Sequence, residues 1–174
     1  MKIGILSDTH GYLDPKLIDF FNDCDEIWHA GDIGDAKVCA ELSKHKPLIS
    51  VYGNIDGTEI RSQFPEIEER TREGLRIMMI HIGGYPGRYD RRIRERLKAN
   101  PPDIFISGHS HILKVIPDKE LDLLHINPGA AGYHGLHQVR TAVRFEIKNS
   151  HIQNLEVIEL GPRSVHEKAP SHKD

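Results

Sequence analysis

The chain has 174 residues, of which 28% are charged and 38% hydrophobic, and its formal net charge is −3. This length and balance are typical of a single soluble globular domain with a substantial core. The small acidic excess gives no electrostatic basis for general binding to nucleic acid or to membranes. The chain also holds 12 histidines, a high number that favours metal or acid–base chemistry.

The amino-terminal apolar run, residues 3–6, is followed at once by Ser7 and Asp8. It is too short for a signal peptide or a membrane span. Cys24 and Cys39 do not form a closely spaced pair, and two free thiols are expected rather than a disulfide. Together these observations predict a cytoplasmic protein.

The first part of the chain alternates predicted strands with short helices. Asp14 is the expected N-cap of the first helix, and Pro15 is expected at its first position. This alternation implies a mostly parallel sheet covered by helices. The pattern predicts strands over residues 2–7, 27–30 and 48–52, and helices over residues 15–22 and 35–43.

The later part of the chain changes to hairpins and alternating strands. Two sheets face to face with helices outside fit this mixture better than one open doubly wound sheet. One domain is expected over residues 1–160, followed by a polar, disordered or loosely held tail over 161–174. The pattern predicts strands over 67–71, 75–80, 104–107, 114–116, 123–126, 139–147 and 152–160, and a charged helix over 90–99.

Five strand-like runs end in Asp, Asn or His. In an α/β sheet, functional side chains gather at the carboxyl ends of the strands, so these residues are expected to converge. Their carboxylate, imidazole and amide groups suit divalent ions such as manganese, iron, zinc, nickel or magnesium. Seven candidates are too many for one catalytic ion but suit two ions that share a carboxylate. The candidates are Asp8, His10, Asp32, Asn54, His81, His109 and His111.

The motifs that hold these residues resemble those of the calcineurin-like metallophosphoesterases, in particular the small bacterial and archaeal branch that also includes the eukaryotic retromer subunit Vps29. The resemblance covers about residues 1–160. It implies an α/β fold, a four-layer αββα sandwich of two mixed sheets, with a dinuclear metal centre at one edge. The matching motifs are Asp8-Thr9-His10, Gly31-Asp32-Ile33, Gly53-Asn54-Ile55-Asp56, His81-Ile82-Gly83, Gly108-His109-Ser110-His111 and Asn127-Pro128-Gly129.

The resemblance also implies how the ligands divide between the two divalent ions. Manganese is expected first, with nickel, iron, zinc or magnesium as alternatives. A hydroxide shared by the ions would attack the phosphorus of a small phosphoester, most simply a phosphodiester. The implied catalytic residues are Asp32, Asn54 and His109. Asp8, His10 and His111 would hold the first ion, Asn54, His81 and His109 the second, and Asp32 would bridge them.

One position departs from the family pattern. Many members carry His directly after the Asn of the third motif, where it assists the leaving group, whereas this chain has Ile55. A well-placed general acid contributes about 10² to 10⁴ in rate. His134, in a glycine-rich loop, is one candidate replacement, and its alternative is a solvated loop histidine. Asp56 is the other, and its alternative is a turn-forming or capping residue.

Several other residues have structural interpretations. His29 is expected to be a packed histidine, either in the core or directly behind the ligands. The same two positions are expected for His125. Arg88 to Arg96 holds five arginines and is interpreted mainly as a charged helix face with i, i+4 pairing. Arg88 and Arg91 remain candidate substrate contacts. The histidines expected to be solvated are His137, His151, His166 and His172.

Two other functions compete with a phosphoesterase. A scaffold or binding module could keep the fold without the chemistry, as the Vps29 relatives suggest, but it need not keep all seven ligands. A nuclease is the second alternative, and the 6% aromatic content and acidic balance argue against a large nucleic-acid surface. No membrane partner is expected, and homo-oligomerisation stays open.

Overall fold

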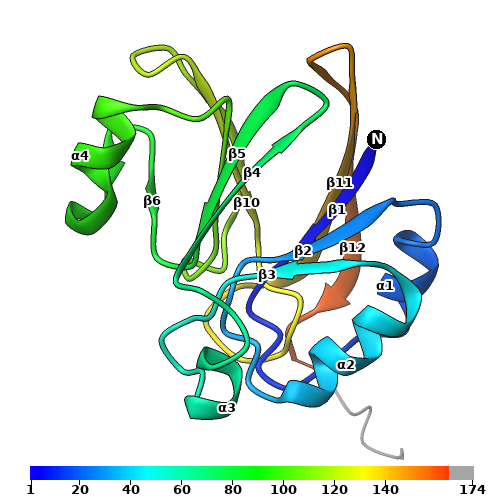
Figure 1. Ribbon diagram of the computed structural model, residues 1–174. Coiled ribbons are helices and arrows are strands. Elements are labelled where there is room, and N and C mark those ends of the chain that lie inside the picture. The colour runs from blue at the N-terminus through cyan, green and yellow to red at the C-terminus, as the bar shows by residue number, and fades with distance from the viewer. Residues whose placement is uncertain (165–174) are drawn as a thin grey trace, which may run out of the picture.

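A computed structural model describes residues 1–164 and shows two five-stranded sheets lying face to face, with helices on their outer sides (Figure 1). The first sheet has the order β12-β11-β1-β2-β3. Strands β1, β2 and β3 run parallel to one another. Strand β11 pairs antiparallel with β1, and β12 pairs antiparallel with β11 at the edge of the sheet. The bounds are β1 (Lys2–Leu6), β2 (Glu26–His29), β3 (Leu48–Ser50), β11 (Val139–Lys148) and β12 (His151–Pro162).

The second sheet has the order β4-β5-β8-β10-β9. Strands β5, β8 and β10 run parallel, and antiparallel strands β4 and β9 form the two edges. A short hairpin of β6 (Gly84–Tyr85) and β7 (Arg88–Tyr89) follows β5. The bounds are β4 (Ile67–Arg72), β5 (Leu75–Ile80), β8 (Ile104–Ser107), β9 (Leu113–Asp118) and β10 (Leu123–Pro128). The expected sandwich of two mixed sheets is therefore confirmed.

The main core lies between the sheets. Successive strand residues point to opposite faces, so Ile3 and Ile5 of β1 meet Ile77 and Ile104 of the second sheet. All four side chains are at most 1% exposed, and each contributes about 1.5–3 kcal/mol by its burial. Gly4 points to the other face, where an added Cβ would lie 2.3 Å from the Phe21 ring.

Helices cover the outer face of each sheet (Figure 1). Helices α1 (Lys16–Phe20) and α2 (Ala36–His45) pack Leu17 and Leu42 over the first sheet, and α4 (Arg91–Ala99) packs Ile93 and Leu97 over the second. A short helix, α3 (Thr58–Arg61), follows β3. Among residues 1–164, no helix combines the length and apolar character that a membrane span requires.

Several predicted boundaries need correction. Helix α1 begins at Lys16, so Pro15 is its N-cap rather than its first residue, although the Asp14 carboxylate does accept a bond from the Lys16 N–H at 3.1 Å. Strand β12 continues to Pro162, two residues beyond the expected end of the domain. The rest of the expected tail, from residue 165 on, lies outside the described residues. Cys24 and Cys39 are free thiols, as expected, and both are buried.

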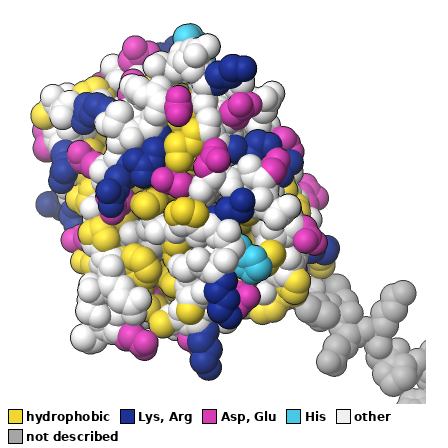
Figure 2. Space-filling model, turned by 45° about the vertical axis from the view of Figure 1, so that its right-hand side comes forward, with side chains coloured by type: hydrophobic (Ala, Val, Ile, Leu, Met, Phe, Trp, Pro, Cys, Tyr) yellow, Lys and Arg dark blue, Asp and Glu magenta, His cyan; other side chains and the backbone are white. Residues whose placement is uncertain are grey.

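The arginines of α4 do not pair as predicted. Arg92 contacts Asp90 and Glu66, and Arg96 contacts Glu69 on β4. Among the described residues, no ion pair on α4 joins positions i and i+4. Figure 2 shows basic and acidic side chains interspersed over one face of the molecule.

Candidate metal centre

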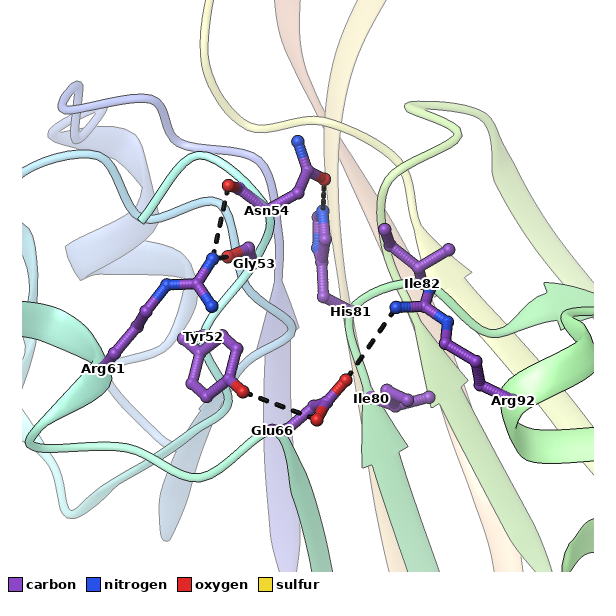
Figure 3. Close-up of a pocket in the computed structure, with 9 residues that line it drawn as sticks. All are labelled: Tyr52, Gly53, Asn54, Arg61, Glu66, Ile80, His81, Ile82 and Arg92. Carbon is purple, nitrogen blue, oxygen red and sulfur yellow. Dashed lines mark hydrogen bonds and ion pairs between the residues drawn. The ribbon is translucent and has the colours of Figure 1, made fainter. Parts of the chain in front are cut away.

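The seven candidate ligands follow the carboxyl ends of five strands, β1, β2, β3, β5 and β8. Two groups have ligand atoms that all lie within 4.8 Å of one another: Asp8 with His10 and His111, and Asp32 with His81 and His109. We call these the first and second ligand groups. The family resemblance implies the same first group and also assigns Asn54 to the second ion, and Asn54 Oδ1 lies 3.1 Å from His81 Nε2 (Figure 3).

Five of the seven candidates have backbone in the left-handed region, with φ between 48° and 63°. L-residues rarely adopt this conformation, which costs about 1–3 kcal/mol per residue and concentrates at functional sites. The strand therefore turns sharply where it ends, and each side chain projects over the sheet edge. The five are Asp8, His10, Asp32, His109 and His111.

The first ligand group presents buried atoms without hydrogen-bond partners. Asp8 Oδ1 and His10 Nε2 are both buried and unpartnered among the described residues. His111 Nε2 lies 3.1 Å from Asp8 Oδ1, and the two form an ion pair only when the His111 imidazole is protonated. Such burial is costly unless another group neutralises these atoms. One carboxylate and two imidazoles are a donor set that fits a divalent cation.

In the second ligand group, the tautomer of His81 is fixed by the backbone. His81 Nδ1 lies 2.8 Å from the Ala30 carbonyl oxygen, which can only accept, so Nδ1 carries the proton. The Nε2 lone pair then faces Asp32 Oδ1 at 3.2 Å and Asn54 Oδ1 at 3.1 Å. Three electron-pair donors converge here, an arrangement that fits a cation.

Asp32 faces both ligand groups. Its Oδ1 lies beside His81, and its Oδ2 lies 3.9 Å from His10 Nε2 in the first group. The backbone N–H of Ile55 also donates to Oδ1 at 3.1 Å. An added Cβ on Gly53 would lie 2.0 Å from the same oxygen, so the close approach requires glycine. Asp32 thus directs one carboxylate oxygen toward each ligand group.

The electrostatics of the groups favour coordination. Burial lowers the pKa of His10 and His109, which keeps their imidazoles neutral as metal ligands must be. The Asp8 carboxylate raises the pKa of His111. Burial opposes charge on His81, but the neighbouring Asp32 raises the pKa of His81 overall. A proton and a metal ion therefore compete for the same lone pair of His81.

Asp56 ties together the two loops that carry Asp32 and Asn54. Its Oδ2 accepts from the backbone N–H groups of Gly53 at 2.7 Å and Ile33 at 3.2 Å, and its Oδ1 accepts from Gly34 at 2.8 Å. The side chain is 3% exposed. These bonds bear out the capping alternative for Asp56 and leave no oxygen directed at a substrate.

His29 is buried behind the ligands, as expected. Its Nδ1 accepts from the Gly31 N–H at 3.2 Å, so its Nε2–H donates to Thr9 Oγ1 at 2.9 Å. Thr9 in turn donates to the Ile33 carbonyl at 2.9 Å. Burial lowers the pKa of His29 to about 4, so it stays neutral. The chain of bonds joins the loop of the first group to that of Asp32.

The loop of residues 132–137 covers the first ligand group. The His134 ring lies 4.7 Å from that of His10, between ring centroids, and the His137 ring lies 5.3 Å from that of His111. His134 is exposed. His137 was expected to be solvated, but it is half-buried and its Nε2 bonds to the Gly132 carbonyl at 3.1 Å. The sequence signal that could have indicated its position near the ligands is that His137 lies three residues after His134 in the same loop.

Two cavities lie near the end of β5, and Ile82 lines both of them. The smaller, of about 160 Å³, reaches Asn54 and His81 and also holds Glu66 and Arg92 (Figure 3). The larger, of about 360 Å³, reaches His109. The metal centre is therefore open to solvent on the side of the second ligand group. The side chain of Ile55, the residue after Asn54, is 47% exposed.

A sandwich of two mixed sheets with two histidine–carboxylate groups at one edge defines a metal-dependent phosphoesterase fold. The calcineurin-like phosphoesterase superfamily domain matches residues 1–150. The chain belongs to this superfamily.

Similar proteins agree with this assignment. A phosphodiesterase of Methanocaldococcus jannaschii is 30% identical over 150 residues, with 76% of this chain and 86% of the relative covered. The solved structure of an archaeal phosphodiesterase has a TM-score of 0.74 and 25% identity, with 91% and 99% coverage. Vps29 of Entamoeba histolytica, solved with zinc, has a TM-score of 0.70 and 19% identity, with 92% and 100% coverage. The likeness to Vps29 extends to the fold alone.

Proposed function

We propose that the protein is a cytoplasmic phosphodiesterase with a dinuclear metal centre, in which manganese is the preferred ion. The observation that carries this proposal is the convergence of two ligand groups on Asp32, with unpartnered buried atoms on Asp8 and His10. Two divalent ions bound here would supply a nucleophile from water and charge neutralisation for the phosphoryl oxygens.

The chain's own residues hold this site rigid. The Ala30 carbonyl orients His81, and Asp56 fixes the loops of Asp32 and Asn54. Arg61 adds bonds to the carbonyls of Gly53 at 3.0 Å and Asn54 at 3.3 Å (Figure 3). Such support of ligand residues affects metal affinity by about 10–100-fold.

We further propose that His134 donates a proton to the leaving group in place of the residue missing at Ile55. Its ring lies beside that of His10 at an angle of 45°, and the residue is exposed to solvent. The variant His134→Ala should slow esters with poor leaving groups more than p-nitrophenyl esters, by up to about 10²-fold. His151→Ala, an exposed histidine on β12, is the matched control. Equal slowing of all esters, or none, would contradict this role.

A non-catalytic scaffold is the second candidate function, and the structural likeness to Vps29 supports it. The complete ligand set favours the enzyme, because a scaffold has no need to keep unpartnered buried acceptors. The interspersed charges of Figure 2 do not support a nuclease surface on that face.

The experiment that separates these functions measures hydrolysis of bis-p-nitrophenyl phosphate and p-nitrophenyl phosphate after chelation and readdition of single metals. The enzyme predicts activity that returns with a divalent ion, is highest with manganese, and favours the diester. His109→Ala should abolish it. No activity with any divalent ion would favour the scaffold.

A further inference from the structure

The cavity of about 360 Å³ beside His109 has a basic lining that the metal centre does not use. It lies between the β6–β7 hairpin, the start of α4 and the loop after β8. Tyr85, Arg88, Arg91 and Ser110 line it together with His109. A group in this cavity would therefore adjoin the second ligand group.

The two arginines of this cavity differ from their neighbours. Arg88 and Arg91 are exposed, and neither forms an ion pair within residues 1–164. Arg92, in contrast, is paired with Asp90 at 2.9 Å. Asp90 also lines the cavity, but its carboxylate is committed to Arg92 and to capping α4. The cavity thus keeps two guanidinium groups that form no ion pair within residues 1–164, beside one carboxylate that is already bonded to Arg92.

Two further groups add to its preference for an anion. The Lys114 ammonium lies 3.4 Å from the centroid of the ring of Tyr85, a residue of the cavity lining. Ser110 Oγ accepts from Asn127 Nδ2 at 3.0 Å and from the Ile112 N–H at 3.4 Å. Because its oxygen accepts twice, the Ser110 hydroxyl has its hydrogen available to donate to a bound group.

The smaller cavity is not suited to an anion in the same way, although two arginines also line it. Arg61 is occupied by the carbonyls of the Asn54 loop and stacks on Tyr52, and Arg92 is paired with carboxylates (Figure 3). Its lining also includes the Glu66 carboxylate. An anion is therefore favoured on the His109 side and not on the Asn54 side.

We propose that the cavity beside His109 binds a second phosphate of the substrate, next to the phosphodiester that the metal centre cleaves. Guanidinium groups match phosphate oxygens in geometry and charge. The substrate class is then a phosphodiester that carries a further phosphate, such as a nucleotide derivative. This inference rests on the proposed phosphodiesterase function and narrows its substrate.

The test compares two substrates that differ by one phosphate: thymidine 5′-(p-nitrophenyl phosphate) and the same ester with a 3′-phosphate. In the manganese-loaded protein, kcat/KM should be about tenfold or more higher for the 3′-phosphorylated ester. Arg88→Ala and Arg91→Ala should each reduce this ratio several-fold. Arg94→Ala, an arginine of α4 outside this cavity, is the matched control and should change neither rate.

A binding measurement separates the two proposals. Calorimetry should show that thymidine 3′,5′-bisphosphate binds more tightly than thymidine 5′-monophosphate, and that Arg88→Ala and Arg91→Ala remove the difference. If neither ester is hydrolysed but this preference holds, the proposed catalysis fails and the anion cavity stands. Equal binding of the two nucleotides, equal rates on the two esters, or an equal effect of Arg94→Ala would overturn the anion cavity.

Discussion

The two sheets contribute different chemistry to the metal centre. The first sheet supplies Asp8, His10, Asp32 and Asn54, of which only His10 offers nitrogen, whereas the second supplies three histidines. Each ligand group nevertheless draws on both sheets, because His111 completes the first group and Asp32 the second. Neither sheet alone can form either group. The candidate metal centre therefore lies between the two sheets, and a bound ion would have ligands from both of them.

The largest expected effect comes from the residue that faces both ligand groups. Asp32→Ala removes the carboxylate whose two oxygens lie beside His81 and His10, so each ligand group would lose a donor. We expect kcat/KM for bis-p-nitrophenyl phosphate to fall by about 10³-fold or more. Asp19→Ala, an exposed aspartate on α1, controls for the loss of a carboxylate. Retention of a tenth of the activity would show that the groups do not depend on Asp32.

Each sheet also contains one buried histidine, and the two rings differ in their hydrogen-bond partners. His29 on β2 has partners for both ring nitrogens, whereas His125 on β10 bonds to Ser107 through Nε2 and leaves Nδ1 without a partner among the described residues. Burial lowers the pKa of His125 to about 4. Between pH 6.5 and 4, His125 is protonated in the unfolded chain but stays neutral in the folded protein. The free energy of unfolding therefore falls as the pH falls.

This effect is measurable in a variant that cannot titrate. Over that pH range, wild type should lose about 3 kcal/mol more of its free energy of unfolding than His125→Gln does. Urea unfolding at a series of pH values, with metal removed by chelation, measures the difference. Parallel pH profiles for the two proteins would mean that the buried ring of the second sheet is protonated in the folded state.

A smaller effect on metal affinity is expected from Asp56, which supports the loops of Asp32 and Asn54. Asp56→Asn leaves one oxygen where the Ile33, Gly34 and Gly53 N–H groups need two, which loosens the loops of Asp32 and Asn54. We expect the affinity of the weaker-bound ion to fall about 10–100-fold by equilibrium dialysis. Asp35→Asn, an N-cap where asparagine serves equally well, is the control. Unchanged affinity would remove Asp56 from the support of the centre.

The sequence predicted much of the site because its ligands follow strands that are easy to recognise. Asp8, His81 and His109 each come directly after or close to an apolar run, and parallel strands bring such ends together. The left-handed backbone of five ligands was not predictable, since non-glycine residues give no local signal for it. His137 was misjudged because its burial depends on His111, which is distant in sequence.

The fold was predictable where the hydrophobic period extends over several residues. Helix α3 and the β6–β7 hairpin were missed, since elements of four and two residues have too few positions to show a period. The pairing of α4 with β4 was also missed, because Arg96 and Glu69 meet only once the second sheet has formed.

The number of metal ions bound per chain tests the central claim most directly. After chelation and dialysis against manganese, wild type should hold two ions. His10→Ala, which removes a first-sheet ligand, and His81→Ala, which removes a second-sheet ligand, should each hold fewer than two. Two ions in wild type with a loss in both variants would establish a centre shared between the sheets. One ion or none in wild type, or two ions in both variants, would contradict it.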